Sequence, residues 1–496
     1  MKRLSVLAAA VGLLIAGPAQ AAWLKAEADR FIIYSSGPEH VLREYAAKLA
    51  AFDGLLQRLA PAASQESSPV KLEIYLVRDF EEMRQVRPGV RNMLGWYRAG
   101  PEGVYALAVA SRANARYDDT LFHEYAHHFM LDRFPVAYPA WFVEGWAEYV
   151  ASAQVVGADI TLGAPDASSA YALLKEDWLA LDVVLSKRVW ELPRDRRGQF
   201  YAQAWLLTHY MQSTAARADQ LNRALRAISA GEAPVKAFET ATGAPLETLT
   251  RELRAYRQLR SVMLRGVATP PRLVVSRLPD SADDLLLDRL RLMDGAAADP
   301  QPHYLGAIRR RAGGHAGDRL AELTLAQAEF LYGDVARGEA ILRRRLEASP
   351  DDIEALRIAG QGQLLAGERR PAERVARFRA GRAYLAKAYA LDQTDYRTLV
   401  AYSQSRTVEP NYPTDNDVNA LLEARGLAPA VQATSVMAAR ALIARGRGAE
   451  AEAILKPVAN NPHGGRLAAE ARALLAGKAK AEPEADEAED GAPPAS

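Results

Sequence analysis

Apolar residues recur along the first part of the chain with the short period of strands, interrupted by one longer helical run. Alternating or β-rich runs mark four predicted strands: 30–35, 70–77, 95–98 and 104–110. In the second of these, Leu72, Ile74 and Leu76 fall on one face, as in a half-buried strand. The last two flank a Gly-Pro-Glu-Gly turn and predict a hairpin, whereas residues 40–59 carry apolar positions at helical spacing. Residues 22–117 are therefore predicted to form a mixed α/β subdomain.

From residue 118 to residue 262 the apolar positions recur at helical spacing. The predicted helices are 118–134, 139–152, 201–210, 220–229 and 246–259. For the first helix, Asp118, Asp119 and Thr120 supply N-cap chemistry, and Pro135 stops the run. Strands followed by helices place the chain in the α+β class, with a helical subdomain after the α/β one.

Prolines then interrupt the pattern. Pro270-Pro271 and Pro279 fall between the helical region and a second series of helices. Because prolines remove backbone donors and end regular structure, residues 263–300 are predicted to be a linker. The linker predicts two separate domains, so removal of everything after it is expected to leave the first domain intact.

Small residues recur at a fixed period in the last part of the chain. Gly333 and Gly367 are 34 residues apart, and Ala326 and Gly360 each precede them by seven residues. This spacing resembles tetratricopeptide (TPR) repeats, in which helix pairs stack into a curved α-solenoid. The resemblance implies an α-solenoid at 301–476 that binds a protein partner on its concave surface. A generic helical bundle is the alternative.

Targeting signals are predicted at the N-terminus. Lys2 and Arg3, a short apolar stretch and the small residues Ala19 and Ala21 have the pattern of a cleaved bacterial signal peptide over 1–21. The apolar stretch is too short to span a membrane comfortably, so we expect a periplasmic or secreted protein without a stable membrane anchor. The acidic, Pro- and Ala-rich end of the chain, within 477–496, predicts disorder.

Composition narrows the chemistry that the chain can perform. The net charge is +1, with Arg interleaved among Glu and Asp, so no nucleic-acid partner is predicted. The chain has no Cys, which excludes a cysteine nucleophile and thiolate metal sites. Any metal ion must therefore be held by His and carboxylate side chains.

One motif carries most of the candidate chemistry. His123, Glu124 and His127 form an H-E-x-x-H sequence on the first predicted helix of the second region. Residues i and i+4 of a helix lie on one side, so both imidazoles can hold one metal ion. Glu124 lies beside them and is a candidate general base. A surface helix that happens to carry two His residues is the alternative.

A third ligand is expected on the next helix. Glu144 follows His127 by 17 residues, and Glu148 lies one turn further on the same face. H-E-x-x-H followed by W-x-x-E-G-x-A-E-Y resembles the gluzincin zinc metallopeptidases, the thermolysin-like clan, and especially its "peptidase MA" branch. The resemblance implies a zincin-like domain in which His123, His127 and Glu144 bind one Zn²⁺ and Glu124 is the general base. It also implies that Glu148 orients a ligand His, with a solvated surface charge as the alternative.

The resemblance also suggests residues for the substrate. Tyr201 falls at about the place where related aminopeptidases carry a catalytic Tyr, and a core aromatic is the equal alternative. The strand at 104–110 corresponds to an edge strand that pairs with substrate, or is an ordinary sheet strand. His128 points away from His127 on a helix, and His209 is expected to be structural.

Three functional hypotheses follow. The first is an exported zinc endopeptidase that hydrolyses peptide or protein substrates and recruits them, or partner proteins, through the TPR-like module. Endopeptidase action is favoured because the Gly-rich segment with which the family's aminopeptidases bind a free amino terminus is not found. The alternatives are a TPR-based scaffold with a vestigial zinc domain, and a zinc hydrolase that cleaves a bond other than a peptide.

Overall fold

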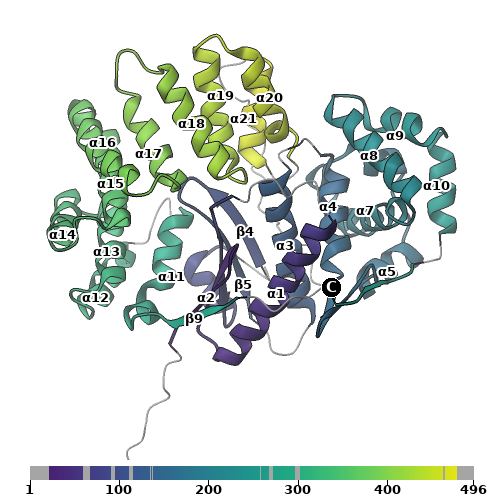
Figure 1. Cartoon of the computed structure of the whole chain (residues 1–496), viewed down its shortest axis with the longest axis horizontal. Helices are drawn as coiled ribbons and strands as arrows, with labels where there is room; N and C mark the ends of the chain where they lie inside the picture. Colours follow the sequence, from purple (N-terminus) through teal and green to yellow (C-terminus); the bar gives the residue numbers. More distant parts are fainter. Residues whose placement is uncertain are drawn as a thin grey trace, which may run out of the picture.

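A mixed sheet forms the centre of the computed structural model of this protein (Figure 1). The structure describes residues 22–59, 68–90, 95–110, 115–134, 136, 138–256, 259–266, 272–295, 302–461 and 464–477. The predicted signal peptide and nearly all of the predicted acidic tail lie outside these residues, as does Pro135. The described part is α+β and mostly helical, as the sequence predicts.

The sheet has six strands in the order β4-β5-β3-β2-β1-β9. Their bounds are β1 Leu24–Glu27, β2 Phe31–Ser35, β3 Leu72–Val77, β4 Gly95–Gly100, β5 Gly103–Val109 and β9 Val274–Arg277. β3 is parallel to β2 and to β5, and the other pairs are antiparallel. The four strands predicted from alternation are confirmed as β2, β3, β4 and β5, and the hairpin β4–β5 is confirmed as well.

Helices cover both faces of the sheet. Leu72, Ile74 and Leu76 are buried on one face, where the strands pack against α1 (Glu39–Leu59) and α3 (Ala115–Arg133). The alternate residues of the same strands are buried against α2 (Phe80–Val86) and α11 (Ser281–Asp294). The strands are apolar on both faces because both faces are covered. The core is thus a three-layer α/β/α arrangement.

The second region is helical, with a small sheet at its side (Figure 1). Its elements are α4 Ala140–Ala151, β6 Gln154–Val156, β7 Asp159–Leu162, α5 Ala167–Lys175, α6 Leu181–Ser186, α7 Arg197–Met211, α8 Ala215–Ser229, α9 Pro234–Thr242, α10 Leu246–Ala255 and β8 Val262–Leu264. All five predicted helices are present, with small differences at their ends. The three-stranded sheet β6-β7-β8 and the helices α5, α6 and α9 are not anticipated by the sequence pattern.

The start of α3 differs from the prediction. The helix begins at Ala115, so positions 118–120 lie within its first turns and not at its N-terminal boundary. The helix ends at Arg133, which agrees with a stop before Pro135. The error has a simple cause, because Asp and Thr favour both the cap and the first turn of a helix.

The prediction of a linker at 263–300 is wrong for its described residues. β9 pairs antiparallel with β1 and forms one edge of the central sheet. α11 contributes Leu286 and Leu290 to the core against the sheet, and β8 pairs with β7. Of the prolines that suggest a linker, Pro279 lies between β9 and α11, where it does not interrupt sheet hydrogen bonds, and Pro270 and Pro271 lie outside the described residues. The chain therefore returns to its first subdomain before the last helices begin.

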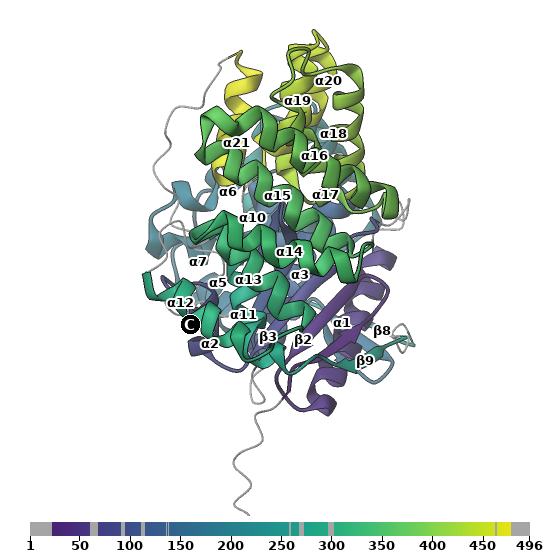
Figure 2. The ribbon, with the colours of Figure 1, turned by 90° about the vertical axis from the view of Figure 1, so that its left-hand side faces the viewer.

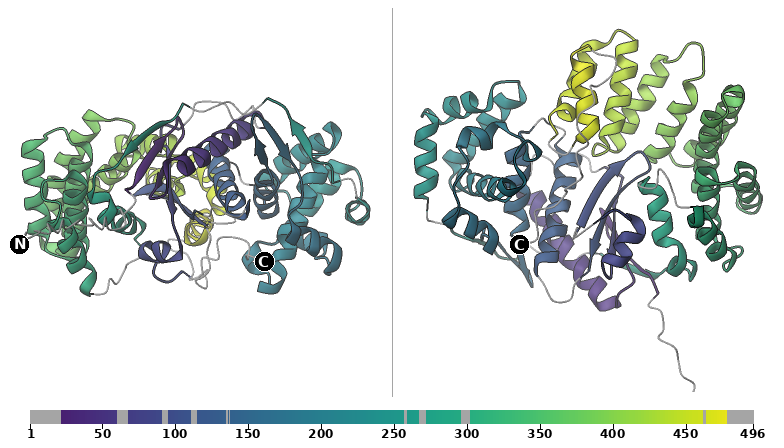
Figure 3. Two further views of the ribbon diagram at one scale, coloured as in Figure 1. Left: turned by 90° about the horizontal axis from the view of Figure 1, so that it is seen from below. Right: turned by 180° about the vertical axis from the view of Figure 1, so that it is seen from behind.

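The last helices form a curved array. Their bounds are α12 Pro302–Gly313, α13 Arg319–Tyr332, α14 Val335–Ala348, α15 Ile353–Arg369, α16 Arg374–Leu391, α17 Tyr396–Arg406, α18 Asp415–Leu427, α19 Gln432–Ala444, α20 Gly448–Ala459 and α21 Gly465–Leu475. Consecutive helices pack against each other, as the predicted stacking of helix pairs requires (Figure 2). The array bends around the sheet, and the inner side of the bend faces α11 and the β4–β5 hairpin (Figures 1 and 3).

The array shares a hydrophobic core with the first subdomain. Leu399, Val400 and Val431 are buried in the same cluster as residues of the sheet, α1 and α3. At its far end, the Arg188 guanidinium donates a hydrogen bond of 3.3 Å to the carbonyl of Ala459. The array therefore contacts both earlier subdomains. Among the helices that the structure describes, none is long and apolar enough to cross a membrane.

Candidate metal centre

Helix α3 carries the two His residues and packs against α1. Phe122 stacks on Phe52 of α1, with ring centroids 4.2 Å apart. The Tyr125 hydroxyl donates to Oδ1 of Asp53, at 2.9 Å. These contacts hold the side of α3 that faces α1, so the opposite side carries His123 and His127 in fixed positions.

Three side chains converge as a metal site would require. The Nε2 atoms of His123 and His127 are 2.9 Å apart. Oε2 of Glu144 lies 3.6 Å from Nε2 of His123 and 3.5 Å from Nε2 of His127. Bonds of about 2.0–2.2 Å in a tetrahedral site would place ligand atoms roughly 3.3–3.6 Å apart. The two edges to Glu144 match that range and the edge between the two imidazoles is shorter, so the three residues could hold one metal ion.

The ligand side chains are almost completely shielded from solvent. His123 and His127 are each 6% exposed and Glu144 is 0% exposed. A buried carboxylate beside two imidazoles is costly unless a cation or a proton balances its charge. A divalent metal ion would supply that balance. The burial therefore supports a metal site over a surface helix that happens to carry two His residues.

Glu144 reaches the site because α4 packs very closely on α7. A Cβ atom at Gly145 would lie 2.3 Å from the carbonyl oxygen of Ala204 and 2.6 Å from Oγ1 of Thr208. No side chain larger than hydrogen fits there without moving a helix backbone. The glycine after the third ligand thus sets the distance between α4, which carries Glu144, and α7, which carries Tyr201.

We expect Gly145→Ala to destabilise the chain by about 1–3 kcal/mol, because overpacking forces the two helices apart. We also expect weaker metal binding, since Glu144 moves with α4. Thermal denaturation and metal titration measure these effects. Gly54→Ala on α1 is the matched control: no atom lies within 4 Å of its Cβ position, so it should be neutral or stabilising. Equal stability of the two variants would contradict the close contact.

Glu148 lies where the sequence predicts a carboxylate that orients a ligand. Its Oε1 is 3.2 Å from Nδ1 of His123, on the side of the ring away from Glu144 and His127. Burial lowers the pKa of His123, but the carboxylates of Glu148, Glu144 and Glu124 outweigh it and raise the pKa to about 9. The metal-free site therefore holds a proton on His123 at neutral pH. With Glu148 on the Nδ1 side of the ring, Nε2 of His123 faces His127 and Glu144.

The proton on His123 makes metal affinity depend on pH. A metal ion binds neutral imidazole, so it must displace the proton from His123 at any pH below about 9. We expect zinc affinity to rise about tenfold per pH unit between roughly pH 6.5 and pH 9. Competition titrations with a chelator at several pH values measure it. Glu148→Gln removes the main charge that raises this pKa, so its affinity should level off at lower pH; identical pH profiles would contradict the assignment.

In the metal-free chain, the proton on His123 makes folding stability depend on pH in the opposite direction to metal affinity. Because the pKa of His123 is raised above its ordinary value, its protonated form stabilises the fold fully below about pH 6.5, the ordinary pKa of His. That contribution is lost as the pH rises through about 9. A bound metal ion and this proton would therefore stabilise the same site at opposite ends of the pH range.

The two candidate catalytic residues, Glu124 and Tyr201, interact electrostatically with the candidate ligands. Glu124 is partly exposed, unlike its neighbours, and its charge acts on His123 and Tyr201. Tyr201 of α7 is 8% exposed. Burial, together with the carboxylates of Glu144, Glu148 and Glu124, raises the pKa of Tyr201 well above its usual range. Its hydroxyl therefore keeps its proton at neutral pH and can donate a hydrogen bond.

The edge strand of the central sheet is β4 and not the strand at 104–110 that the resemblance implies. β5, which covers the predicted 104–110 strand, lies between β3 and β4 and is buried throughout, so it is not an edge. β4 is the edge of the sheet on this side, antiparallel to β5 and in contact with α3. The correction follows from the hairpin, because its first strand folds back outside its second.

Two other His residues lie beside tyrosine hydroxyls, and one of these tyrosines, Tyr97, was not singled out from the sequence. Nδ1 of His128 lies 3.0 Å from the hydroxyl of Tyr97 on β4. Nδ1 of His209 lies 3.0 Å from the hydroxyl of Tyr256. Neither His belongs to the metal-capable group found among the described residues. Nothing in the local sequence distinguishes Tyr97 from other strand aromatics, so its link between β4 and α3 was not predictable.

Comparison with known proteins adds no further constraint. The chain matches no model of a protein family, no curated protein and no solved structure. The site must therefore be interpreted from its own geometry and chemistry.

Proposed function

We propose that this protein is an exported zinc-dependent metallopeptidase of the gluzincin type, more specifically an endopeptidase. The observation that carries the proposal is the buried triangle of His123, His127 and Glu144, with Glu124 on the turn between the two His residues. Two imidazoles and one carboxylate are a donor set of catalytic zinc sites, which leave a fourth position open. A structural zinc site would instead use four protein ligands.

The residues around the triangle have the chemistry that peptide hydrolysis needs. When bound, zinc would activate a water molecule and polarise the substrate carbonyl. Glu124 accepts a proton from the attacking water and passes it to the leaving amine. Tyr201, whose raised pKa keeps it protonated, donates a hydrogen bond to the oxyanion. Glu148 holds the imidazole of His123.

Strand β4 offers a place for the substrate backbone. It pairs with β5 on one side only, and Tyr97 brings it into contact with the metal helix α3. An extended peptide that adds to this edge would place its main chain beside α3. Recognition through main-chain hydrogen bonds suits peptide or protein substrates of varied sequence.

The role of the helical array as a TPR module is part of the proposal. Stacked helix pairs are common platforms for protein partners. Because the inner side of the array faces the sheet, a recruited substrate or partner would contact the outer side or the ends (Figure 3). Export to the periplasm or the medium is proposed from the predicted signal peptide, residues 1–21.

The test is hydrolysis of a denatured protein such as unfolded casein by the purified full-length chain. Zinc-loaded wild type should cleave it, a chelator should stop cleavage, and added zinc should restore it. Glu124→Gln is the matched inactive variant. If the zinc-loaded chain cleaves neither denatured protein nor a peptide library, the peptidase proposal fails. The alternative of a scaffold with a vestigial zinc domain would then be favoured.

A further inference from the structure

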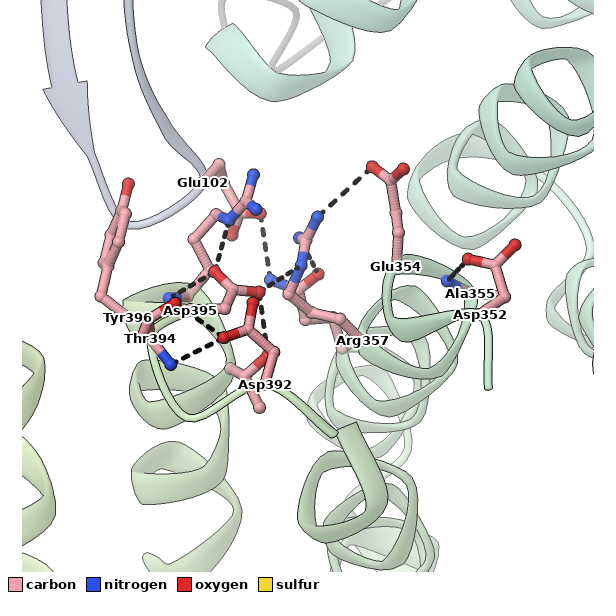
Figure 4. A network of polar contacts seen from close by, with 12 residues as sticks. Glu102, Asp352, Glu354, Ala355, Arg357, Asp392, Thr394, Asp395 and Tyr396 are labelled. Carbon is pink, nitrogen blue, oxygen red and sulfur yellow. Dashed lines mark hydrogen bonds and ion pairs between the residues drawn. The ribbon is translucent and has the colours of Figure 1, made fainter. Parts of the chain in front are cut away.

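The turn between β4 and β5 is held from outside by the helical array. The hydroxyl of Tyr396, at the start of α17, donates a buried hydrogen bond of 2.8 Å to the carbonyl of Gly100, the last residue of β4. Nε2 of Gln361 on α15 donates to Oε2 of Glu102 in the turn, at 3.1 Å. In Figure 4, Tyr396 points from α17 toward the two strands, and Glu102 lies close to Arg357 and Asp395. Two helices of the array thus hold one turn.

Arg357 joins these two contacts into one network. It is 5% exposed, and its Nη1 donates to Oε1 of Gln361 at 3.2 Å. Its Nε lies 3.3 Å from Oδ2 of Asp395, the residue before Tyr396 (Figure 4). Burial lowers the pKa of Arg357 to about 10, which still leaves it charged at neutral pH. A movement of either helix would therefore be transmitted to the other contact.

The same strand is joined to the metal helix. The Tyr97 hydroxyl is 3.0 Å from Nδ1 of His128, the residue after the ligand His127. Burial raises the pKa of Tyr97, as do the charges of Asp132 and Glu124 and the hydroxyl of Tyr396.

β4 needs such support because it is an edge strand. An edge strand is hydrogen-bonded on one side only, so its amides open more easily than those of central strands. Without Tyr396 and Gln361, β4 would be held by its pairing with β5 and by its packing contacts with neighbouring helices. The position of β4 relative to α3 would then depend on direct contacts between the two, such as that of Tyr97 with His128.

We propose that Tyr396, Gln361 and Arg357 are positioning residues: the helical array fixes edge strand β4 against the metal helix and so sets how tightly an extended peptide is held at the site. The consequence for substrate rests on the proposed peptidase function, whereas the positioning of β4 does not. The array then acts within the chain as a support of the substrate edge.

Tyr396→Phe tests this in the full-length chain, because it keeps the buried ring and removes only the hydroxyl. We expect amide hydrogen exchange in residues 95–100 to become about tenfold faster, since a buried carbonyl loses its donor. Exchange in α4 and α7, and zinc content, should stay as in wild type. With a peptide substrate, KM should rise roughly threefold to tenfold while kcat changes little, because ground-state binding is lost.

The matched control is Tyr389→Phe, which removes a hydroxyl bound to Glu423 inside the array, at 3.1 Å. In this variant, the rate of amide hydrogen exchange in β4 should equal that of wild type. Gln361→Met, at a half-buried position, is a second variant and should accelerate the same amides by a smaller factor.

Unchanged β4 exchange in Tyr396→Phe and Gln361→Met overturns the proposal. So does faster exchange spread over the whole chain, which would show a purely structural role. If zinc-loaded wild type cleaves no peptide, the proposed function fails, but the exchange result still decides whether the array positions β4.

Discussion

Replacement of Glu124 by Gln should leave zinc bound and nearly abolish hydrolysis. Gln has the size and helix propensity of Glu but cannot accept a proton from water. General-base catalysis contributes about 10²–10⁴-fold, so we expect kcat for a fluorogenic peptide to fall by that factor. KM should change little. Kinetics on the zinc-loaded chain and metal analysis by mass spectrometry measure both quantities.

Retention of zinc by Glu124→Gln follows from the site. Glu124 is not part of the triangle of ligand atoms formed by His123, His127 and Glu144. Its charge is one of those that raise the pKa of His123, so its removal makes the proton easier to displace. Glu44→Gln, a solvent-exposed change on α1, is the control and should keep wild-type activity. Wild-type activity of Glu124→Gln, or loss of its zinc, would contradict the assigned role.

Removal of the helical array should prevent the rest of the chain from folding. A chain that ends at Gly295 lacks Leu399, Val400 and Val431, which are buried in the same core as the sheet, α1 and α3. It also exposes Leu285 of α11, which is 0% exposed in the intact chain. Each buried Leu or Val stabilises by about 1.5–3 kcal/mol, so the loss approaches the whole stability of a domain, about 5–15 kcal/mol.

We therefore expect the truncated chain to show no cooperative thermal transition and no stoichiometric zinc binding. Circular dichroism, calorimetry and metal analysis test this. Deletion of residues 478–496, whose sequence predicts disorder, is the control and should leave the melting temperature unchanged. A folded, zinc-binding fragment ending at Gly295 would show that the array is an independent domain, as the predicted linker at 263–300 implies.

The sequence predicts the array as a separate domain, whereas in the structure it packs into the core of the first subdomain. The helices, their amphipathic faces and the small residues between them are local patterns, and they are confirmed as stacked helices. What the inner face of the array packs against is not determined by neighbouring residues in the sequence. Tyr396 meets Gly100 and Ser68 meets the carbonyl of Leu427 across hundreds of residues of chain. No periodicity within a helix specifies such a partner.

The identity of the edge strand also depends on contacts between distant parts of the chain. Alternation predicts β4 and β5 and the turn between them, and both strands are confirmed. Alternation by itself does not reveal which of the two strands pairs with β3, although β5 is the more apolar of the two. The order β4-β5-β3 is set when the hairpin docks on the central strands. The candidate substrate edge therefore moves from β5 to β4, and Tyr97 becomes part of the site.

The sequence by itself determined the candidate ligands and base: the spacing of His123 and His127 on one helix, Glu124 beside them, and Glu144 and Glu148 on the next. These follow from helical periodicity and motif, which depend on neighbouring residues alone. Only the tertiary structure decided that Gly145 brings α4 onto α7, that β9 and α11 complete the first subdomain, and that the array closes on β4. Those contacts join residues far apart in the chain, and they form because apolar faces and edge hydrogen bonds must be satisfied by whichever element reaches them.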